Sequence, residues 1–410
     1  MLAKNGIVHL YELPENEVCI KLPKRIQKEM FLLASKIAGD NIKLSKILKI
    51  NNATLHDFKK SRFASTRLKI VEKLSNFLVK NGYKQYTLEN LEKKVLAIKT
   101  HWVGKFIYNP KFPINFNTEA GVISIGAFLF DGGITQNKYP FYTNSEKYLI
   151  DKVIRSVEKT VGKINYNIRK QKTGTIVLDL PKILGLILIH GLNIPAGKKI
   201  FTNPEIPEFI MNGSKEIKRA FLQQAFDDEG TPQPGKNTSG RGIQLTQSGV
   251  SRKPSIRLFQ LKELISSFNI PVNGPHYMQE YVSKSGTITH LWAIQITNQR
   301  DIRKFAERIN FSLTRKIKKL QEVLDSYVLP EKYKKGENLK VALKACEKLK
   351  SQNRKITIRD ISKLINRTEL HTKDIMDVLV KQNSLMIIKP KRSSKQYRGG
   401  FLPKEFEALR

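Results

Sequence analysis

Cysteine is nearly absent from this chain of 410 residues, and acidic residues are scarce. The two cysteines, Cys19 and Cys346, are too few and too isolated for a disulfide framework or a zinc site. No apolar run reaches the roughly 18 residues of a transmembrane helix, and no signal-peptide pattern opens the chain. These absences predict an intracellular protein of the cytoplasm or nucleoid, in a reducing setting and without a membrane partner.

The scarcity of acidic residues leaves a large positive charge. The chain has 73 lysines and arginines against 36 aspartates and glutamates, a formal net charge of +37. The excess is spread along the whole sequence, which favours several domains on a nucleic acid over one membrane-binding patch. A merely well-solvated lysine-rich surface is the alternative, but solubility requires much less charge. We therefore expect a polyanionic partner.

Two segments almost a hundred residues apart carry the same pattern. Residues 124–132 read SIGAFLFDG and residues 222–230 read LQQAFDDEG, so each is a mostly apolar run that ends in an acidic residue and a glycine. After each run, predicted strands and helices alternate in the same order. The predicted strands are 139–142, 175–180, 242–246 and 290–297, and the predicted helices are 145–161, 181–190, 255–268 and 299–309. This recurrence indicates a duplication.

The sequence before the repeats predicts a small helical domain at 1–85 and an ordered connector at 86–118. Short amphipathic segments at 27–37, 44–48 and 54–60, with Asn52 as a candidate N-cap, have the spacing of a helix-turn-helix. The alternative is a small helix bundle that binds no DNA. The two repeats are placed at 119–212 and 213–328.

Residues 329–410 are predicted to form a separate basic domain. Helices at 337–349 and 370–381 precede an apolar stretch, 385–388, that could pair with 401–402 as a hairpin. This order favours a winged helix whose wing lies along a phosphate backbone. The basic residues of the wing are Lys389, Lys391, Arg392, Lys395 and Arg398. A disordered basic tail is the alternative.

The two acid-glycine segments resemble the paired motifs of the LAGLIDADG homing endonucleases. Residues 206–212 and 261–271 are similar to the flanks in the monomeric, intein-associated branch, and so are 197–199 and 305–316. The resemblance covers about half of the chain. It implies an α+β fold: a pseudo-twofold duplicated αββαββα core with an antiparallel β-saddle, here flanked by the helix-turn-helix and winged-helix domains. It also implies a monomer.

The resemblance assigns Asp131 and Glu229 as the acids that hold Mg2+ or Mn2+ between two packed motif helices, and it includes Gly132 and Gly230 in the metal site. The small residues expected at the helix crossing are Gly126, Ala127 and Ala225, whereas Gln224 stands where a small residue is usual. Asp228 is a second candidate acid, and Asp227 is expected to hydrogen-bond within the helix pair. An alternative alignment of the first motif places Gly132 where the family has its acid. In that alignment only the second repeat supplies an acid to the metal site.

Each half of the family also carries a basic residue near the scissile phosphate. Lys172 and Lys284 are the candidates, and simple contact with phosphates is the alternative for both. Candidate base-reading side chains on the saddle are Gln136, Lys138, Tyr142, Gln244, Thr246, Gln295 and Thr297. Glutamine, lysine and threonine can reach base edges, but a solvated strand face has the same composition.

The functional hypothesis is a site-specific, metal-dependent endonuclease of double-stranded DNA. A non-cleaving DNA-binding protein or transcriptional regulator is the first alternative, and an RNA-splicing maturase that binds folded intron RNA is the second. The chain begins with Met1 and ends with Arg410, without the nucleophile and asparagine that protein splicing requires. We therefore expect a free-standing protein.

Overall fold

The computed structural model describes residues 5–60, 65–100, 104–235, 240–282, 286–327, 337–388 and 405–408. The chain forms two compact units. The larger unit comprises Met1–Pro232 and Ile243–Lys318, and the smaller comprises Gln233–Gly242 and Lys319–Arg410. The five-domain division stays a prediction. Within the described residues, none of the helices combines the length and the apolar composition needed to cross a membrane.

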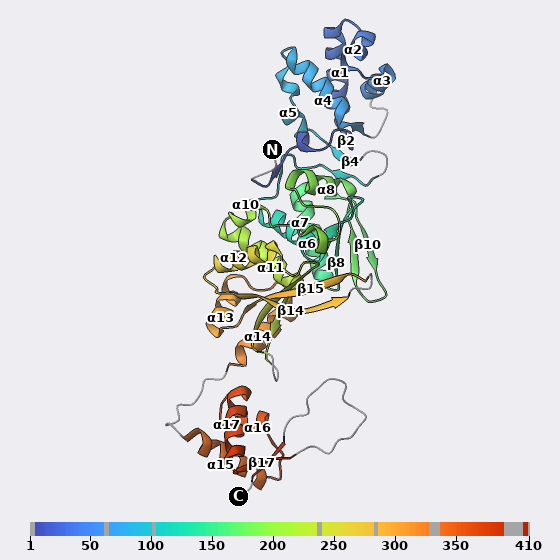
Figure 1. Ribbon diagram of the computed structural model, residues 1–410. Helices are drawn as coiled ribbons and strands as arrows, with labels where there is room; N and C mark the ends of the chain where they lie inside the picture. Colours follow the sequence, from blue (N-terminus) through green and yellow to red (C-terminus); the bar gives the residue numbers. More distant parts are fainter. Residues whose placement is uncertain are drawn as a thin grey trace. The chain divides into compact units, whose positions relative to one another are not determined.

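The first repeat forms a four-stranded antiparallel sheet with helices against it (Figure 1). Its elements are α6 (Glu119–Leu129), β7 (Gly132–Ile134), β8 (Pro140–Asn144), α7 (Lys147–Val161), β10 (Asn167–Lys170), β11 (Ile176–Asp179) and α8 (Lys182–Leu186). The strand order is β10-β11-β8-β7. A π-helix, η3 (Ile187–Gly191), continues α8 through the rest of the predicted helix.

The second repeat has the same order of elements. These are α11 (Lys215–Glu229), β12 (Gly230–Gln233), β13 (Gly242–Gly249), α12 (Ile256–Ser266), β14 (Asn273–Val282), β15 (Ile288–Ile296) and α13 (Gln299–Arg308). The strand order is β12-β13-β15-β14. It matches the first sheet when that sheet is taken from its other edge, as β7-β8-β11-β10. The α+β class and the repeated order of helices and strands are therefore confirmed, and β10 and β14 are strands that the sequence pattern did not predict.

Strand register decides which side chains face the helices. Ile243 lies opposite Ile296, and Leu245 lies opposite Ile294, so one face of the second sheet is apolar and buried. Because side chains alternate along a strand, the neighbouring polar residues point to the other face. Gln244 and its partner Gln295 are on that face.

Four helices form the N-terminal part of the larger unit. They are α1 (Lys24–Ala38), α2 (Asn41–Leu48), α3 (Asn52–Lys60) and α4 (Leu68–Lys80), and α1 packs against the other three. Asp40 caps α2 by accepting from the Lys43 backbone N–H at 2.7 Å. The cap of α3 is Asn51, which accepts from the Ala53 N–H at 2.8 Å. The prediction of Asn52 as this cap is wrong by one residue, because Asn52 already has helical conformation.

A five-stranded sheet of order β3-β2-β4-β5-β9 joins these helices to the first repeat. Its strands are β2 (Val18–Lys21), β3 (Thr66–Arg67), β4 (Ala97–Thr100), β5 (Ile107–Tyr108) and β9 (Lys163–Ile164). A further pair joins β1 (Ile7–Val8) to β6 (Ile114–Asn115). The predicted connector, 86–118, therefore supplies three of the strands that attach the N-terminal helices.

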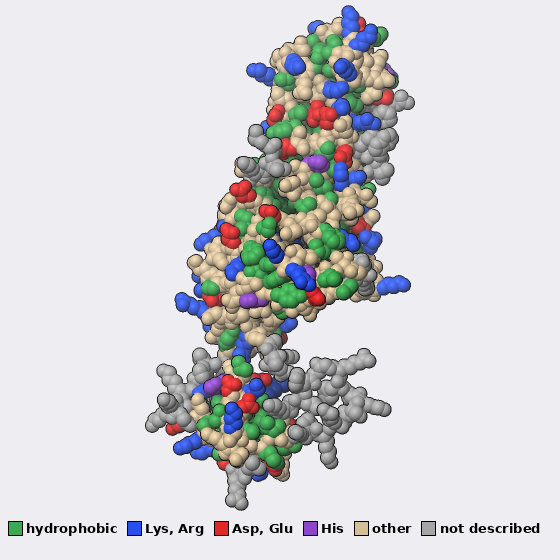
Figure 2. Space-filling view, viewed as in Figure 1, with side chains coloured by type: hydrophobic (Ala, Val, Ile, Leu, Met, Phe, Trp, Pro, Cys, Tyr) green, Lys and Arg blue, Asp and Glu red, His purple; other side chains and the backbone are tan. Residues whose placement is uncertain are grey.

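The shorter elements complete the larger unit. They are η1 (Leu10–Glu12), η2 (Lys84–Tyr86), α5 (Leu88–Glu92), α9 (Lys199–Thr202) and α10 (Glu208–Met211), while α14 (Thr314–Asp325) leads into the smaller unit. Lysine and arginine side chains are spread over the face seen in Figure 2 and do not gather in one patch. This distribution agrees with the even spread of positive charge along the sequence.

The smaller unit packs three helices with a three-stranded sheet of order β16-β18-β17. The elements are α15 (Glu337–Ser351), β16 (Ile356–Thr357), α16 (Ile358–Leu364), α17 (Glu369–Lys381), β17 (Leu385–Ile388) and β18 (Glu405–Ala408). Cys346, Met376 and Phe406 lie in its core, and neither of the two cysteines of the chain is in a disulfide. The strand that pairs with β17 is 405–408; the predicted partner, 401–402, and the basic run from Lys389 to Arg398 lie outside the described residues.

Candidate active site

The two motif helices, α6 and α11, pack against each other at the centre of the larger unit (Figure 1). They approach closely at Gly126, where an added Cβ atom would lie 3.1 Å from Cγ of Gln224. Gly126 and Gln224 are the third residues of their two motifs. The side chain of Gln224 is accommodated at this crossing because the residue opposite it has none.

After each motif helix, an acidic residue precedes a glycine that starts a strand: α6 ends at Leu129, two residues before Asp131, whereas α11 continues through Glu229. A Cβ on Gly132 would lie 2.4 Å from the Phe141 carbonyl oxygen, and one on Gly230 would lie 2.6 Å from a ring carbon of Phe226. Only glycine allows each strand to return so closely beneath its helix. Asp131 and Glu229 are therefore the last side chains before matching turns.

The carboxyl groups of Asp131 and Glu229 act on each other electrostatically. Burial raises the pKa of Asp131, and the positive charges of Lys199 and Lys316 oppose that rise. Burial also raises the pKa of Glu229, and the charge of Asp131 raises it further. Two desolvated carboxylates that repel each other favour a bound cation. The predicted pair therefore shares one environment.

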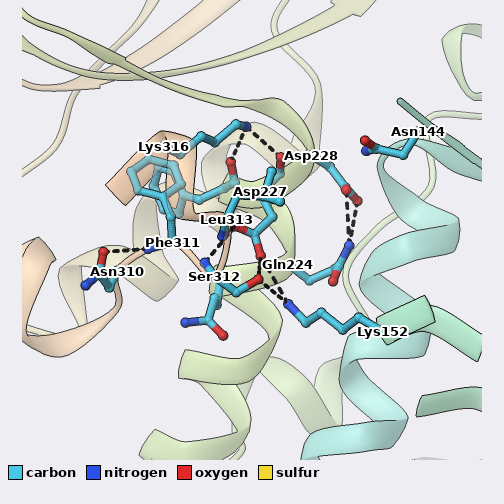
Figure 3. Close-up of polar contacts among 12 residues, drawn as sticks. Asn144, Lys152, Gln224, Asp227, Asp228, Asn310, Phe311, Ser312, Leu313 and Lys316 are labelled. Atoms are coloured by element: carbon cyan, nitrogen blue, oxygen red, sulfur yellow. Dashed lines mark hydrogen bonds and ion pairs between the residues drawn. The ribbon is translucent and has the colours of Figure 1, made fainter. Parts of the chain in front are cut away.

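A hydrogen-bonded chain connects Asp131 to the second motif helix. Asn144 Nδ2 donates to Asp131 Oδ2 at 2.8 Å and lies 3.4 Å from the Tyr142 hydroxyl. That hydroxyl donates to Asp228 Oδ1 at 2.6 Å. Gln224 Nε2 donates to both oxygens of Asp228 at 3.0 and 3.1 Å, as Figure 3 shows. Gln224 thus positions Asp228, whose pKa burial and the charge of Asp131 hold well above the usual range.

Tyr142 is consequently not a DNA-reading residue. Its side chain is fully buried and shares a face of the first sheet with Leu178, toward the helices. Its partners are Asp228 and Gln224. The prediction placed it on the wrong face, and the neighbouring Phe141 and Thr143 point to the other side.

Asp227 belongs to a separate buried network (Figure 3). Its carboxylate forms an ion pair with Lys152 of α7 at 3.1 Å and accepts from the Ser312 and Leu313 backbone N–H groups at 2.8 and 3.3 Å. The Ser312 hydroxyl also donates to it. The prediction that Asp227 hydrogen-bonds within the motif helix pair is wrong, because its partners come from α7 and from the segment before α14.

Lys199 and Arg257 bring positive charge to the acids. Together with Glu229, Thr246, Gln247 and Ser248 they line a cavity of about 170 Å³. Burial, and then the charge of Arg257, lower the pKa of Lys199 to about 8, while Glu229 and Asp131 oppose that fall. Burial lowers the pKa of Arg257 to about 10. Within the described part of the chain, Arg257 Nε and Gln247 Nε2 are buried without a hydrogen-bond acceptor.

Lys316 closes the end of the second motif helix. Its ammonium group donates to the backbone oxygens of Phe226, Asp227 and Gly230 at 2.9, 2.5 and 2.7 Å. A cation at a helix C-terminus stabilises the last carbonyl groups, which have no hydrogen-bond partner within the helix. The Gly230 carbonyl is thus already bonded to Lys316, and a metal role for Gly132 and Gly230 stays a prediction.

Of the other predicted residues, Thr246 lines the cavity beside Glu229, and the rest lie elsewhere or outside the described residues. Lys172 is exposed in the turn between β10 and β11, and Lys284 lies outside the described residues. Lys138 is in the β7–β8 turn, where it pairs with Glu17 at 2.7 Å. Exposed or partly exposed positions on or beside the sheets are occupied by Gln136, Thr246, Gln295 and Thr297, whereas Gln244 is largely buried.

Comparison with known proteins agrees with this geometry. No family model matches the chain. Homing endonuclease I-ApeI of Aeropyrum pernix is 25% identical to it over 205 residues, which are 49% of this chain and 85% of that protein. The match points to the same kind of protein as the duplicated fold and the two acid-glycine pairs do. The chain is therefore similar to a homing endonuclease over about half of its length.

Other matches cover smaller parts of longer proteins. A DNA polymerase of Thermococcus hydrothermalis is 30% identical over 183 residues, and a DNA gyrase of Mycobacterium gordonae is 24% identical over 217 residues. These regions are 44% and 52% of this chain, which spans only 10% and 36% of the two relatives. A solved structure of I-DmoI in complex with DNA and Ca aligns with 48% of this chain and 91% of its own, at 12% identity and a TM-score of 0.30.

Proposed function

We propose that this protein is a site-specific endonuclease that hydrolyses both strands of duplex DNA with a divalent metal. The observation that supports it best is the pair of acids, Asp131 and Glu229, each directly before the glycine that starts β7 or β12, with Lys199 and Arg257 acting on them electrostatically. Hydrolysis of a phosphodiester builds negative charge on the attacked phosphate and the leaving oxygen. One acid in each half serves one strand.

The residues present fit Mg2+ or Mn2+. Among the described residues, no cluster of three or more histidine, cysteine, aspartate or glutamate side chains could hold an ion alone. Mg2+ characteristically binds one or two carboxylates and completes its shell with water and substrate phosphate oxygens. Asp131 and Glu229 would hold the ion, which when bound activates a water and offsets charge on the phosphate.

The side chains around the cavity would hold the phosphate itself. Lys199, Arg257 and Gln247 line it, and the buried Nε of Arg257 and Nε2 of Gln247 have hydrogens available for an oxygen acceptor. Charge-assisted hydrogen bonds to phosphate are stronger than neutral ones. We assign to Lys199 and Arg257 the role that the sequence assigned to Lys172 and Lys284.

Base reading would come from the sheet faces turned away from the helices. In the second sheet this face carries Thr246, Gln295 and the β14 residues Asn273 and His276, which the strand register sets opposite Gln295 and Ala293. In the first sheet it carries Arg169 and Thr143, which lie opposite Val177. The flanking regions are proposed to be a helix-turn-helix and a winged helix that add contacts to the DNA, and the chain is proposed to act as a monomer.

The proposed activity predicts cleavage of a defined sequence. Purified protein should linearise a few members of a plasmid library with long random inserts when Mg2+ is present, and none in EDTA. Sequencing the new ends would return one target, cut on both strands. Binding of one duplex sequence without any nicking in Mg2+ or Mn2+ would instead favour a non-cleaving regulator. Preference for folded intron RNA over duplex DNA would favour a maturase.

The pKa of Lys199 predicts a loss of cleavage at high pH. Because this pKa is lowered to about 8, the side chain loses its charge well below the pH at which an ordinary lysine does. The single-turnover cleavage rate of the wild type should therefore fall as the pH rises from about 8 to about 9.5. Lys199→Arg stays charged over this range, so its rate should not fall. The proposal for Lys199 fails if both proteins give the same profile.

A further inference from the structure

The α2–α3 segment of the N-terminal region has the local geometry of a DNA-binding helix pair. Three residues, 49–51, separate the two helices, and Lys49 adopts a left-handed conformation there, with φ of 49°. Lys73 of α4 donates to the Leu48 carbonyl at 2.8 Å and fixes the turn. Turns of three to four residues are typical of helix-turn-helix motifs.

The exposed face of α3 carries polar side chains that can bind bases. Asn52, His56 and Lys60 are spaced by four residues, lie on one side of the helix and are exposed, while Leu55 and Phe58 are buried in the bundle. Asparagine and lysine make hydrogen bonds to base edges in the major groove.

The surroundings of α3 are basic. Residues 24–60 hold nine lysines and arginines against three acidic residues. Three of the lysines, Lys43, Lys46 and Lys49, are exposed along α2, next to α3. Positive side chains beside a recognition helix bind phosphates and fix its register on the duplex. The charge therefore fits the same partner as the α3 face.

Continuous sheet structure ties this helix pair to the nuclease core. Strand β2 precedes α1 and pairs with β4, β4 pairs with β5, and β5 pairs with β9, which follows α7 of the first repeat. The pairing of β1 with β6 and the Glu17–Lys138 ion pair add two further connections. A flexible tether would instead let the two parts vary their separation at small entropic cost.

We infer that α3 reads a second segment of duplex DNA, separate from the segment under the two repeat sheets, and that the two segments must lie at one fixed spacing. The inference rests on the proposed DNA binding of the sheets. It adds to that function a bipartite target whose geometry is set by the β3-β2-β4-β5-β9 sheet.

The first test removes the α3 contacts. Duplexes recovered from a random pool by the full chain in Ca2+ would be footprinted with wild type and with Asn52→Ala/His56→Ala/Lys60→Ala. The triple variant should lose one end of the footprint and bind about a thousandfold more weakly, since three base contacts are lost and each is worth roughly tenfold. Lys28→Ala/Lys36→Ala on the exposed side of α1 is the control and should keep the whole footprint.

The second test changes the DNA. Inserting about 5 base pairs between the two protected segments turns one of them by half a helical turn. Wild-type affinity should fall as far as that of the triple variant, while the triple variant should not respond to the insertion. Tolerance of the insertion by wild type, or a full footprint with the triple variant, would overturn the inference. A two-segment footprint without cleavage in Mg2+ would remove only the proposed nuclease activity.

Discussion

Asp131→Asn and Glu229→Gln should each abolish double-strand cleavage while leaving DNA binding in place. A carboxylate that holds a catalytic metal supplies several kcal/mol of transition-state stabilisation, so the single-turnover rate should fall by about a thousandfold or more. Affinity measured in Ca2+ should be unchanged or slightly higher, because burial and then the charge of Asp131 raise the pKa of Glu229, and removing one charge relieves the repulsion between the two acids. The readout is conversion of a target plasmid to linear DNA in Mg2+.

Glu263→Gln is the matched control, since Glu263 is exposed on α12 and the change has the same chemistry as Glu229→Gln. It should cut at the wild-type rate. Full-rate cutting by either Asp131→Asn or Glu229→Gln would show that the metal acids have been assigned to the wrong residues. In that case Asp228, which lies one residue before Glu229, would be the next candidate.

Asp227→Ala should be the most destabilising single substitution among the polar residues of the motif helices. It leaves the buried ammonium group of Lys152 without a partner and frees the Ser312 and Leu313 N–H groups. Breaking a buried ion pair by removing one partner typically costs about 3–5 kcal/mol of unfolding free energy. Denaturant unfolding of the full chain, followed for the transition of the larger unit, measures the change.

Two comparison variants isolate the cause of this effect. Glu29→Ala breaks the exposed Arg25–Glu29 pair of α1 and should cost much less stability than Asp227→Ala, because water screens the two charges. Lys152→Met/Asp227→Leu removes both charges and should recover much of the stability lost in Asp227→Ala. An Asp227→Ala change no larger than that of Glu29→Ala would contradict a structural role for the ion pair.

The repeated architecture was predictable because its signals are local. An apolar run followed by acid-glycine marks both α6 and α11, and amphipathic periodicity marks α7 and α13. Strand β14 gave no such signal: almost all of its side chains are exposed, so it lacks the alternation that reveals a half-buried strand. Strand β10 is entirely exposed and escaped prediction for the same reason.

Within the site, the acids were predictable and their partners were not. Asp131 and Glu229 are marked by the glycine that follows each of them. Lys199 and Arg257 reach these acids only through tertiary packing, and one lysine among many in a basic chain has no distinguishing pattern. Tyr142 was assigned to the wrong face because a single-residue change of register exchanges the two faces of a strand.

The crossing of the motif helices has a consequence for how the two halves can combine. The Gln224 side chain occupies the space that a side chain at position 126 would need. A Cβ atom added to Gly126 would lie only 3.1 to 3.2 Å from two Gln224 carbon atoms. A second repeat paired with a copy of itself would place two glutamines where one now meets a glycine, and both would not fit. The repeats are therefore complementary rather than interchangeable. Covalent linkage in one polypeptide guarantees that each Gln224 meets a Gly126.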